Sequence, residues 1–83
     1  MHKLEWTEDA LEDLQKLDNH IRQRILKKLT WFSEYFDDVI PEPLSGDFVG
    51  AYKFRIGDWR VVYTIEQDIV VIQAIGHRRE VYR

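Results

Sequence analysis

The sequence predicts an α+β fold, in which an N-terminal strand and a two-helix hairpin pack on an antiparallel β-sheet meander. Apolar residues recur at helical spacing in the N-terminal half, whereas apolar and polar residues alternate between short turn sequences in the C-terminal half. The chain has 83 residues, of which 45% are hydrophobic and 33% charged. We therefore expect one folded domain spanning residues 1–83, since two separate cores would each bury too little surface.

The N-terminal half is expected to form a short strand followed by two helices. The segment HKLEW alternates apolar and polar residues, and Thr7 is a good N-cap for a helix from Glu8 to Leu17. Asp18 or Asn19 can cap the second helix. The apolar stripe of that helix consists of Ile21, Ile25, Leu29, Phe32 and Phe36. Because the connection between the helices is so short, we expect them to pack antiparallel.

The C-terminal half is expected to be a sheet. Pro41 to Asp47 predicts a loop that joins the two halves. Three segments rich in β-branched and aromatic residues follow, and we expect them to be strands: Phe48 to Ile56, Trp59 to Ile65 and Ile69 to Ile75. The separators GD (57–58) and EQD (66–68) have the size and residue types of hairpin turns.

Composition excludes several classes of function. The chain has no cysteine, and its three histidines are far apart in sequence, so we expect neither a metal nor another cofactor. Without a signal peptide or a membrane-spanning apolar run, a cytoplasmic protein with no membrane partner is expected. The net charge of −3 is uneven: residues 1–47 hold 6 Lys and Arg against 11 Asp and Glu, whereas residues 48–83 hold 6 against 4. We expect a polyanion to meet the second half.

Three cations are expected to lie together on the open face of the sheet. Lys53 and Arg55 are two residues apart in one predicted strand, so they project to the same face. Arg60 in the next strand is expected to join them. Spacing alone leaves two interpretations open: a solvated surface partly neutralised by Asp58 and Glu66, or an anion-binding site.

Three further segments follow one another in a recognisable order. They are YKFR from Tyr52 to Arg55, GDWRVVY from Gly57 to Tyr63 and IGHRREVY from Ile75 to Tyr82, preceded by Leu44 and Gly46. In order and spacing they resemble the signature of the RelE/ParE toxins of bacterial type II toxin–antitoxin systems. The resemblance extends over essentially the whole chain and implies a RelE-like, microbial-RNase-like fold.

In the RelE branch, the resemblance implies a metal-independent endoribonuclease that enters the ribosomal A site, cuts messenger RNA and so inhibits translation. The matching positions are Lys53, Arg55, Arg60, Arg78 and Tyr82. Lys53 is then the candidate general base, while Arg55 and Arg60 hold the phosphate. Arg78 would stabilise the developing charge, and Tyr82 would stack on a base or relay a proton.

The residue that takes the proton stays open. Family nucleases often carry a lysine where this chain has Arg55, and arginine is a poor general base. His77 is a second candidate acid or base, because free histidine titrates near neutral pH. A structural role for His77 is the alternative.

Two other functions fit the same signature. A ParE-type toxin would bind and inhibit DNA gyrase without nuclease activity, and an inactive relative would only bind its antitoxin. All three interpretations imply a cognate antitoxin protein as partner, and the RelE interpretation adds the ribosome and messenger RNA. Expression without an antitoxin should arrest growth for either toxin and not for the inactive relative.

Overall fold

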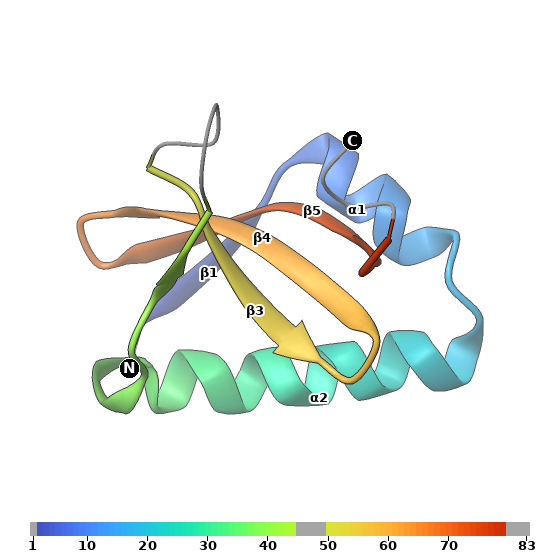
Figure 1. Cartoon of the computed structure of the whole chain (residues 1–83), viewed down its shortest axis with the longest axis horizontal. Helices are drawn as coiled ribbons and strands as arrows, with labels where there is room; N and C mark the ends of the chain where they lie inside the picture. The colour runs from blue at the N-terminus through green and yellow to red at the C-terminus, as the bar shows by residue number, and fades with distance from the viewer. Residues whose placement is uncertain (1, 45–49, 80–83) are drawn as a thin grey trace.

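The computed structural model describes residues 2–44 and 50–79, which form two α-helices on one five-stranded sheet (Figure 1). The elements are β1 (Lys3–Trp6), α1 (Glu8–Gln15), α2 (Asn19–Glu34), the 3-10 helix η1 (Phe36–Asp38), β2 (Glu42–Pro43), β3 (Tyr52–Ile56), β4 (Trp59–Glu66) and β5 (Ile69–His77). The strand order is β1-β5-β4-β3-β2. The predicted meander is confirmed, and the sheet is mixed because β1 pairs with β5 in parallel.

Both helices begin at the predicted caps. The Thr7 hydroxyl accepts the N–H of Ala10 at 3.1 Å, and the Asp18 carboxylate accepts the N–H of Ile21 at 3.3 Å. Each cap accepts a hydrogen bond from a backbone N–H that has no partner within the first helical turn. α1 ends at Gln15, earlier than predicted, and α2 runs in the opposite direction (Figure 1). Within the described ranges, no helix is both long and apolar enough to cross a membrane.

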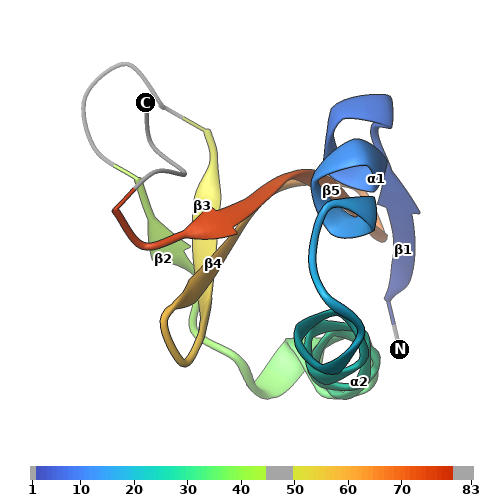
Figure 2. The ribbon, with the colours of Figure 1, turned by 90° about the vertical axis from the view of Figure 1, so that its right-hand side faces the viewer.

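The core fills the space between the sheet and the helices. Its buried residues are Ala10, Leu14, Ile25, Leu29, Phe32, Phe36, Ile56, Val61, Tyr63, Val70, Ile72 and Ile75. Phe32 lies among the aromatic residues, with its ring centroid 4.3 Å from that of Phe54 and 5.1 Å from that of Tyr63. Figure 2 looks along α2, which lies below the sheet, while α1 packs against β5.

The segment between α2 and β3 differs from the prediction. Glu42–Pro43 form the strand β2, although residues 41–47 are predicted to be a loop. The N–H of Leu44 extends this pairing by donating to the carbonyl of Ala51 at 3.0 Å. A proline is tolerated in β2 because this strand lies at the edge of the sheet, where its missing N–H breaks no ladder.

The ends of the other strands also differ from the prediction. β3 begins at Tyr52, because Gly50 has a φ of +88° that takes the chain out of the extended conformation. Phe48, the predicted first residue of this strand, lies outside the described residues. β4 and β5 extend beyond their predicted ends, to Glu66 and His77 respectively.

A β-bulge changes the phase of β5. The pairing of β4 with β5 shifts between Val62 and Tyr63, which leaves Gln73 as an extra residue. The buried side chains of β5 are consequently Val70, Ile72 and Ile75. The Asp13 carboxylate of α1 accepts the N–H of Ile75 at 2.9 Å, so the helix satisfies a backbone group next to the bulge.

Both hairpin turns of the meander have a positive φ at their first residue, +60° at Gly57 and +57° at Gln67. Glycine adopts this conformation without the cost of about 1–2 kcal/mol that a side chain incurs. At Gly57 an added Cβ would also lie 2.7 Å from Nη2 of Arg24. The β3–β4 turn therefore favours glycine through its backbone conformation, while the Arg24 side chain would have to move to make room for a Cβ.

Candidate functional site

The β3–β4 hairpin places two arginines side by side. Arg55 lies directly opposite Arg60 in the strand pairing. Lys53 projects to the same face, as predicted, because it is two residues from Arg55. Like charges directly opposite one another destabilise a sheet. The sheet nevertheless places these two like charges side by side, and Lys53 completes a group of three cations on this face.

Glu42 of β2 bridges two of these cations. Its Oε2 lies 2.8 Å from Nη2 of Arg55 and 3.1 Å from Nζ of Lys53. Arg55, followed by Lys53, lowers the pKa of Glu42 below its ordinary value of 4.5. At neutral pH an ionised carboxylate therefore lies between the Lys53 and Arg55 cations.

The β3–β4 turn contacts both Arg60 and a fourth cation, Arg78. Nη1 of Arg60 donates to the carbonyls of Gly57 at 2.8 Å and Trp59 at 2.9 Å. The backbone N–H of Arg78 donates to the carbonyl of Asp58 at 2.8 Å, and its Nη1 lies 3.7 Å from the Asp58 carboxylate. Arg60 and Arg78 come from different strand ends, yet both are held by the same turn.

Two predicted residues are not brought to these cations. Arg60 pairs with Gly76, whereas His77 pairs with Trp59 and its ring stands edge-on to the Trp59 indole, with centroids 5.7 Å apart. Because successive residues of a strand face opposite sides, His77 lies on the other face from Arg60. Tyr82 lies outside the described residues. Catalytic roles for His77 and Tyr82 stay predictions.

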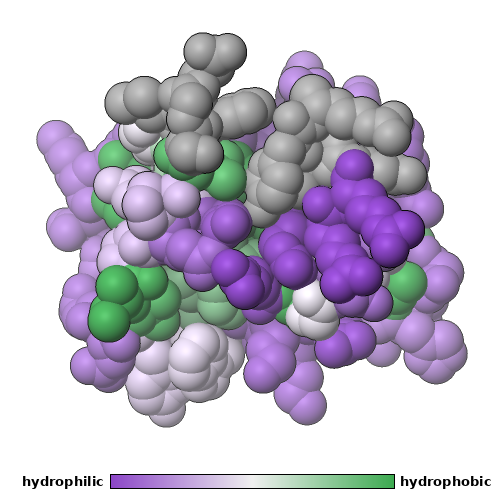
Figure 3. Space-filling view, viewed as in Figure 1, coloured by the Kyte–Doolittle hydropathy of each residue, from purple (hydrophilic) through white to green (hydrophobic). Residues whose placement is uncertain are grey.

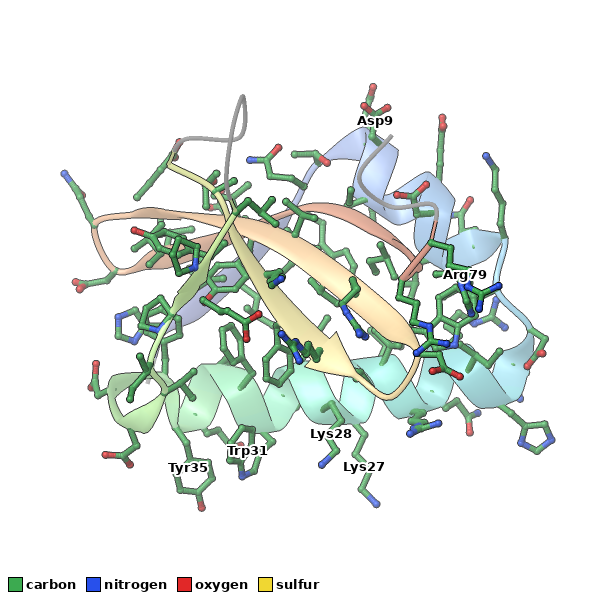
Figure 4. All side chains as sticks on the ribbon, in the orientation of Figure 1. Asp9, Lys27, Lys28, Trp31, Tyr35 and Arg79 are labelled. Atoms are coloured by element: carbon green, nitrogen blue, oxygen red, sulfur yellow. The ribbon has the colours of Figure 1, made fainter. Side chains whose placement is uncertain are left out.

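The surface above the cationic strands is hydrophilic. Figure 3 shows hydrophilic residues gathered over β3, β4 and their turn, with a hydrophobic patch beside them towards the end of α2. In Figure 4, Lys27, Lys28, Trp31 and Tyr35 project from the side of α2 that faces away from the sheet. The lysines of α2 are therefore separate from the strand cations. Among the residues that the structure describes, no group of three potential metal ligands lies together.

Glu42 is a member of the site that the sequence pattern does not predict, because residues 41–47 read as a loop. A clue is present in the sequence: each residue before a proline favours the extended conformation, and Glu42 lies in the segment PEP. In the solvated-surface interpretation Glu66 would neutralise part of this face, but Glu66 pairs with Ile69 at the far end of β4 from Arg60. Asp58 does neutralise a cation, but this cation is Arg78.

Replacing Glu42 by Gln should reduce the loss of stability that the protein shows when the pH is lowered. A lowered pKa means that the carboxylate stabilises the fold above pH 4.5 and loses this effect as the pH falls through its value in the folded state. We expect the wild type to be more stable than Glu42→Gln at pH 7 and this difference to shrink at pH 3. Urea denaturation at low salt measures it, with Glu34→Gln on α2 as the control, and a difference that does not change with pH would contradict the assignment.

The chain matches the family described as the ParE toxin of type II toxin–antitoxin system, parDE, over residues 4–82. A curated Escherichia coli protein assigned as a RelE-like toxin is 32% identical over 81 residues, which cover 93% of this chain and 83% of that protein.

Solved structures agree with these matches. The toxin–antitoxin complex RelBE2 of Mycobacterium tuberculosis contains a chain with a TM-score of 0.82 and 28% identity, covering 93% of this chain and 98% of that one. For the isolated E. coli RelE toxin the TM-score is 0.75 and the identity 25%, covering 93% and 84%. Both have the arrangement of helices and sheet described above. This chain therefore belongs to the RelE/ParE superfamily of toxins from type II toxin–antitoxin systems.

Proposed function

We propose that this toxin is a ribosome-dependent endoribonuclease that cuts messenger RNA in the A site and inhibits translation. The observation that carries the proposal is the cationic face formed by Arg55 and Arg60 with Lys53 beside them. A folded sheet has no need of two arginines directly opposite one another, whereas a phosphodiester undergoing cleavage needs cations on several of its oxygens. The similarity to RelE structures supports the same assignment.

The reaction proposed is attack of a ribose 2′-hydroxyl on the adjacent phosphate. The 2′-hydroxyl gives its proton to Lys53 as the new O–P bond yields a cyclic phosphate, while the bond to the 5′-oxygen breaks and that oxygen takes up a proton from water. Arg55 and Arg60 hold the phosphate through charge-assisted hydrogen bonds, and Arg78 stabilises the charge that develops on it. No step of this scheme requires a cofactor.

Glu42 must yield to the substrate in this scheme. A phosphate that binds Arg55 competes with the Glu42 carboxylate, which contacts Arg55 and Lys53. Lys53 remains the proposed proton acceptor, and displacement of Glu42 makes its amine available to the 2′-hydroxyl. The displaced carboxylate is then an additional acceptor for the proton of the 2′-hydroxyl, because it no longer has the cations that lower its pKa.

We further propose a cognate antitoxin as the protein partner. The relative from M. tuberculosis was solved as a toxin–antitoxin complex, and it matches this chain over 93% of its length. An antitoxin would prevent toxicity by covering the cationic face or by blocking entry to the ribosome.

A gyrase inhibitor is the second candidate function. The matched family description names ParE, and ParE-type toxins bind DNA gyrase without nuclease chemistry. The two functions differ in what the cations do, because gyrase binding requires no reacting phosphate.

In-vitro translation with purified protein distinguishes the two functions. Primer extension maps the ends of the messenger on stalled ribosomes. We expect new ends in the A site that depend on both the toxin and the ribosome. Translation that continues without cuts would reject the nuclease, and inhibition of gyrase supercoiling by the same preparation would then establish the ParE-type function.

A further inference from the structure

An open-sided pocket of about 250 Å³ lies at the edge of β3, beside the cationic face. Its apolar lining consists of Val39 and Ile40, which precede β2, together with Phe54 and Tyr63. Its volume is below the range of about 300–1,000 Å³ typical of sites for drug-sized ligands. The pocket thus has room for a small flat group between aliphatic and aromatic side chains.

The polar rim of the pocket is part of the candidate site. Glu42, Lys53 and Arg55 line it together with the apolar residues. A ligand that fills the pocket therefore lies next to whatever anion Lys53 and Arg55 hold. A small ring attached to a phosphate fits this juxtaposition of an apolar pocket and a cationic rim.

The edge of β3 supplies hydrogen-bonding groups at the same place. The carbonyl of Ala51 points towards β2, because it accepts the N–H of Leu44. In an antiparallel strand every second residue directs its backbone groups to the same side, so the N–H and C=O of Arg55 also point that way. The pairing with β2 ends at Lys53, so no strand in the described residues covers Arg55 on this side.

We propose that this pocket receives one nucleobase of a single-stranded RNA, with the neighbouring phosphate on Arg55 and beside Lys53. The base would stack against Phe54 and Ile40, and its polar edge would meet the backbone N–H and C=O of Arg55. Tyr63 lines the pocket as a neutral phenol, since burial raises the pKa of Tyr63 to about 12. The inference rests on the proposed function, because it assumes that the bound phosphate belongs to RNA.

Nucleotide binding tests the pocket without the ribosome. We would titrate the full chain with adenosine 3′-monophosphate, ribose 5-phosphate and inorganic phosphate, and follow backbone amide shifts by NMR. All three ligands should shift Lys53 and Arg55, whereas only the nucleotide should shift Ile40 and Phe54. Equal effects of the nucleotide and ribose 5-phosphate on all four residues would overturn the proposal.

A variant at Ile40 separates the pocket from the phosphate site. Ile40 is 90% exposed, so Ile40→Ser should leave the fold intact. It should weaken binding of the nucleotide about fivefold and leave binding of inorganic phosphate unchanged, while Leu11→Ser on α1 should affect neither. Unchanged affinity of Ile40→Ser for the nucleotide would overturn the proposal.

Failure of the pocket assignment and failure of the nuclease function would give different results. If the wild-type protein binds the nucleotide through Ile40 but cuts no messenger, the pocket assignment stands and the proposed reaction is rejected. Conversely, if Ile40→Ser and wild type cut the same messenger at the same positions and rates, the pocket assignment would be rejected and the nuclease would stand.

Discussion

Replacing Arg60 by Ala is expected to slow messenger RNA cleavage by about 100-fold or more, the usual loss when one group that stabilises transition-state charge is removed. Arg60 lies opposite Arg55, and its guanidinium is held by the carbonyls of Gly57 and Trp59. It is therefore oriented before substrate binds, and little reorganisation is needed during the reaction. Single-turnover cleavage on programmed ribosomes measures the loss directly.

Two further variants show whether this loss comes from catalysis. Arg60→Lys retains the charge and loses the planar donor geometry, so we expect an intermediate rate. Lys27→Ala removes a cation from the side of α2 that faces away from the sheet, and it should cut at the wild-type rate (Figure 4). Because Arg60 faces another arginine, Arg60→Ala should keep its thermal midpoint. Cleavage by a folded Arg60→Ala at the wild-type rate would exclude Arg60 from the reaction.

Replacing Phe32 by Ala should lower the free energy of unfolding by about 3–5 kcal/mol. The Phe32 side chain is fully buried and its ring contacts those of Phe36, Phe54 and Tyr63. A chain of this size has a total stability of about 4–12 kcal/mol, so the loss would remove a large share of it. The cavity would also open directly behind β3 and so disturb the strand that carries Lys53.

Urea denaturation followed by circular dichroism measures this effect. Trp31→Ala is the matched control, because Trp31 is the neighbouring aromatic residue in α2 and is 47% exposed. We expect the control to lose less than about 1 kcal/mol. Similar losses for the two variants would mean that Phe32 does not have the central position described here.

The helices and the meander were predictable because their signals are local. Thr7 and Asp18 cap the helices by bonds to residues three positions away, and such spacing is visible in the sequence. The β2 strand was not predictable in this way. Its two residues gain their conformation from pairing with Tyr52 and Lys53, and that pairing depends on how the preceding segment folds back.

Some features of the candidate site likewise follow from local sequence, whereas others depend on long-range pairing. That Lys53, Arg55 and Arg60 share a face follows from the alternation along two adjacent strands. The position of His77 on the other face does not follow from simple alternation, because the extra residue Gln73 shifts the phase of β5. Glu42 joins the cations through the pairing of β2 with β3, and the PEP segment indicates its extended conformation but not this pairing.

The parallel pairing of β1 with β5 affects when the toxin becomes folded during its synthesis. β1 is made first among the described elements and β5 last, yet Lys3 pairs with Ile69 and Trp6 with Ile72. Contacts between such distant parts of a chain form late and slow folding. The sheet that holds the cations therefore cannot be completed until β5 has been synthesised, so the cationic face gains its central support only at the end of synthesis.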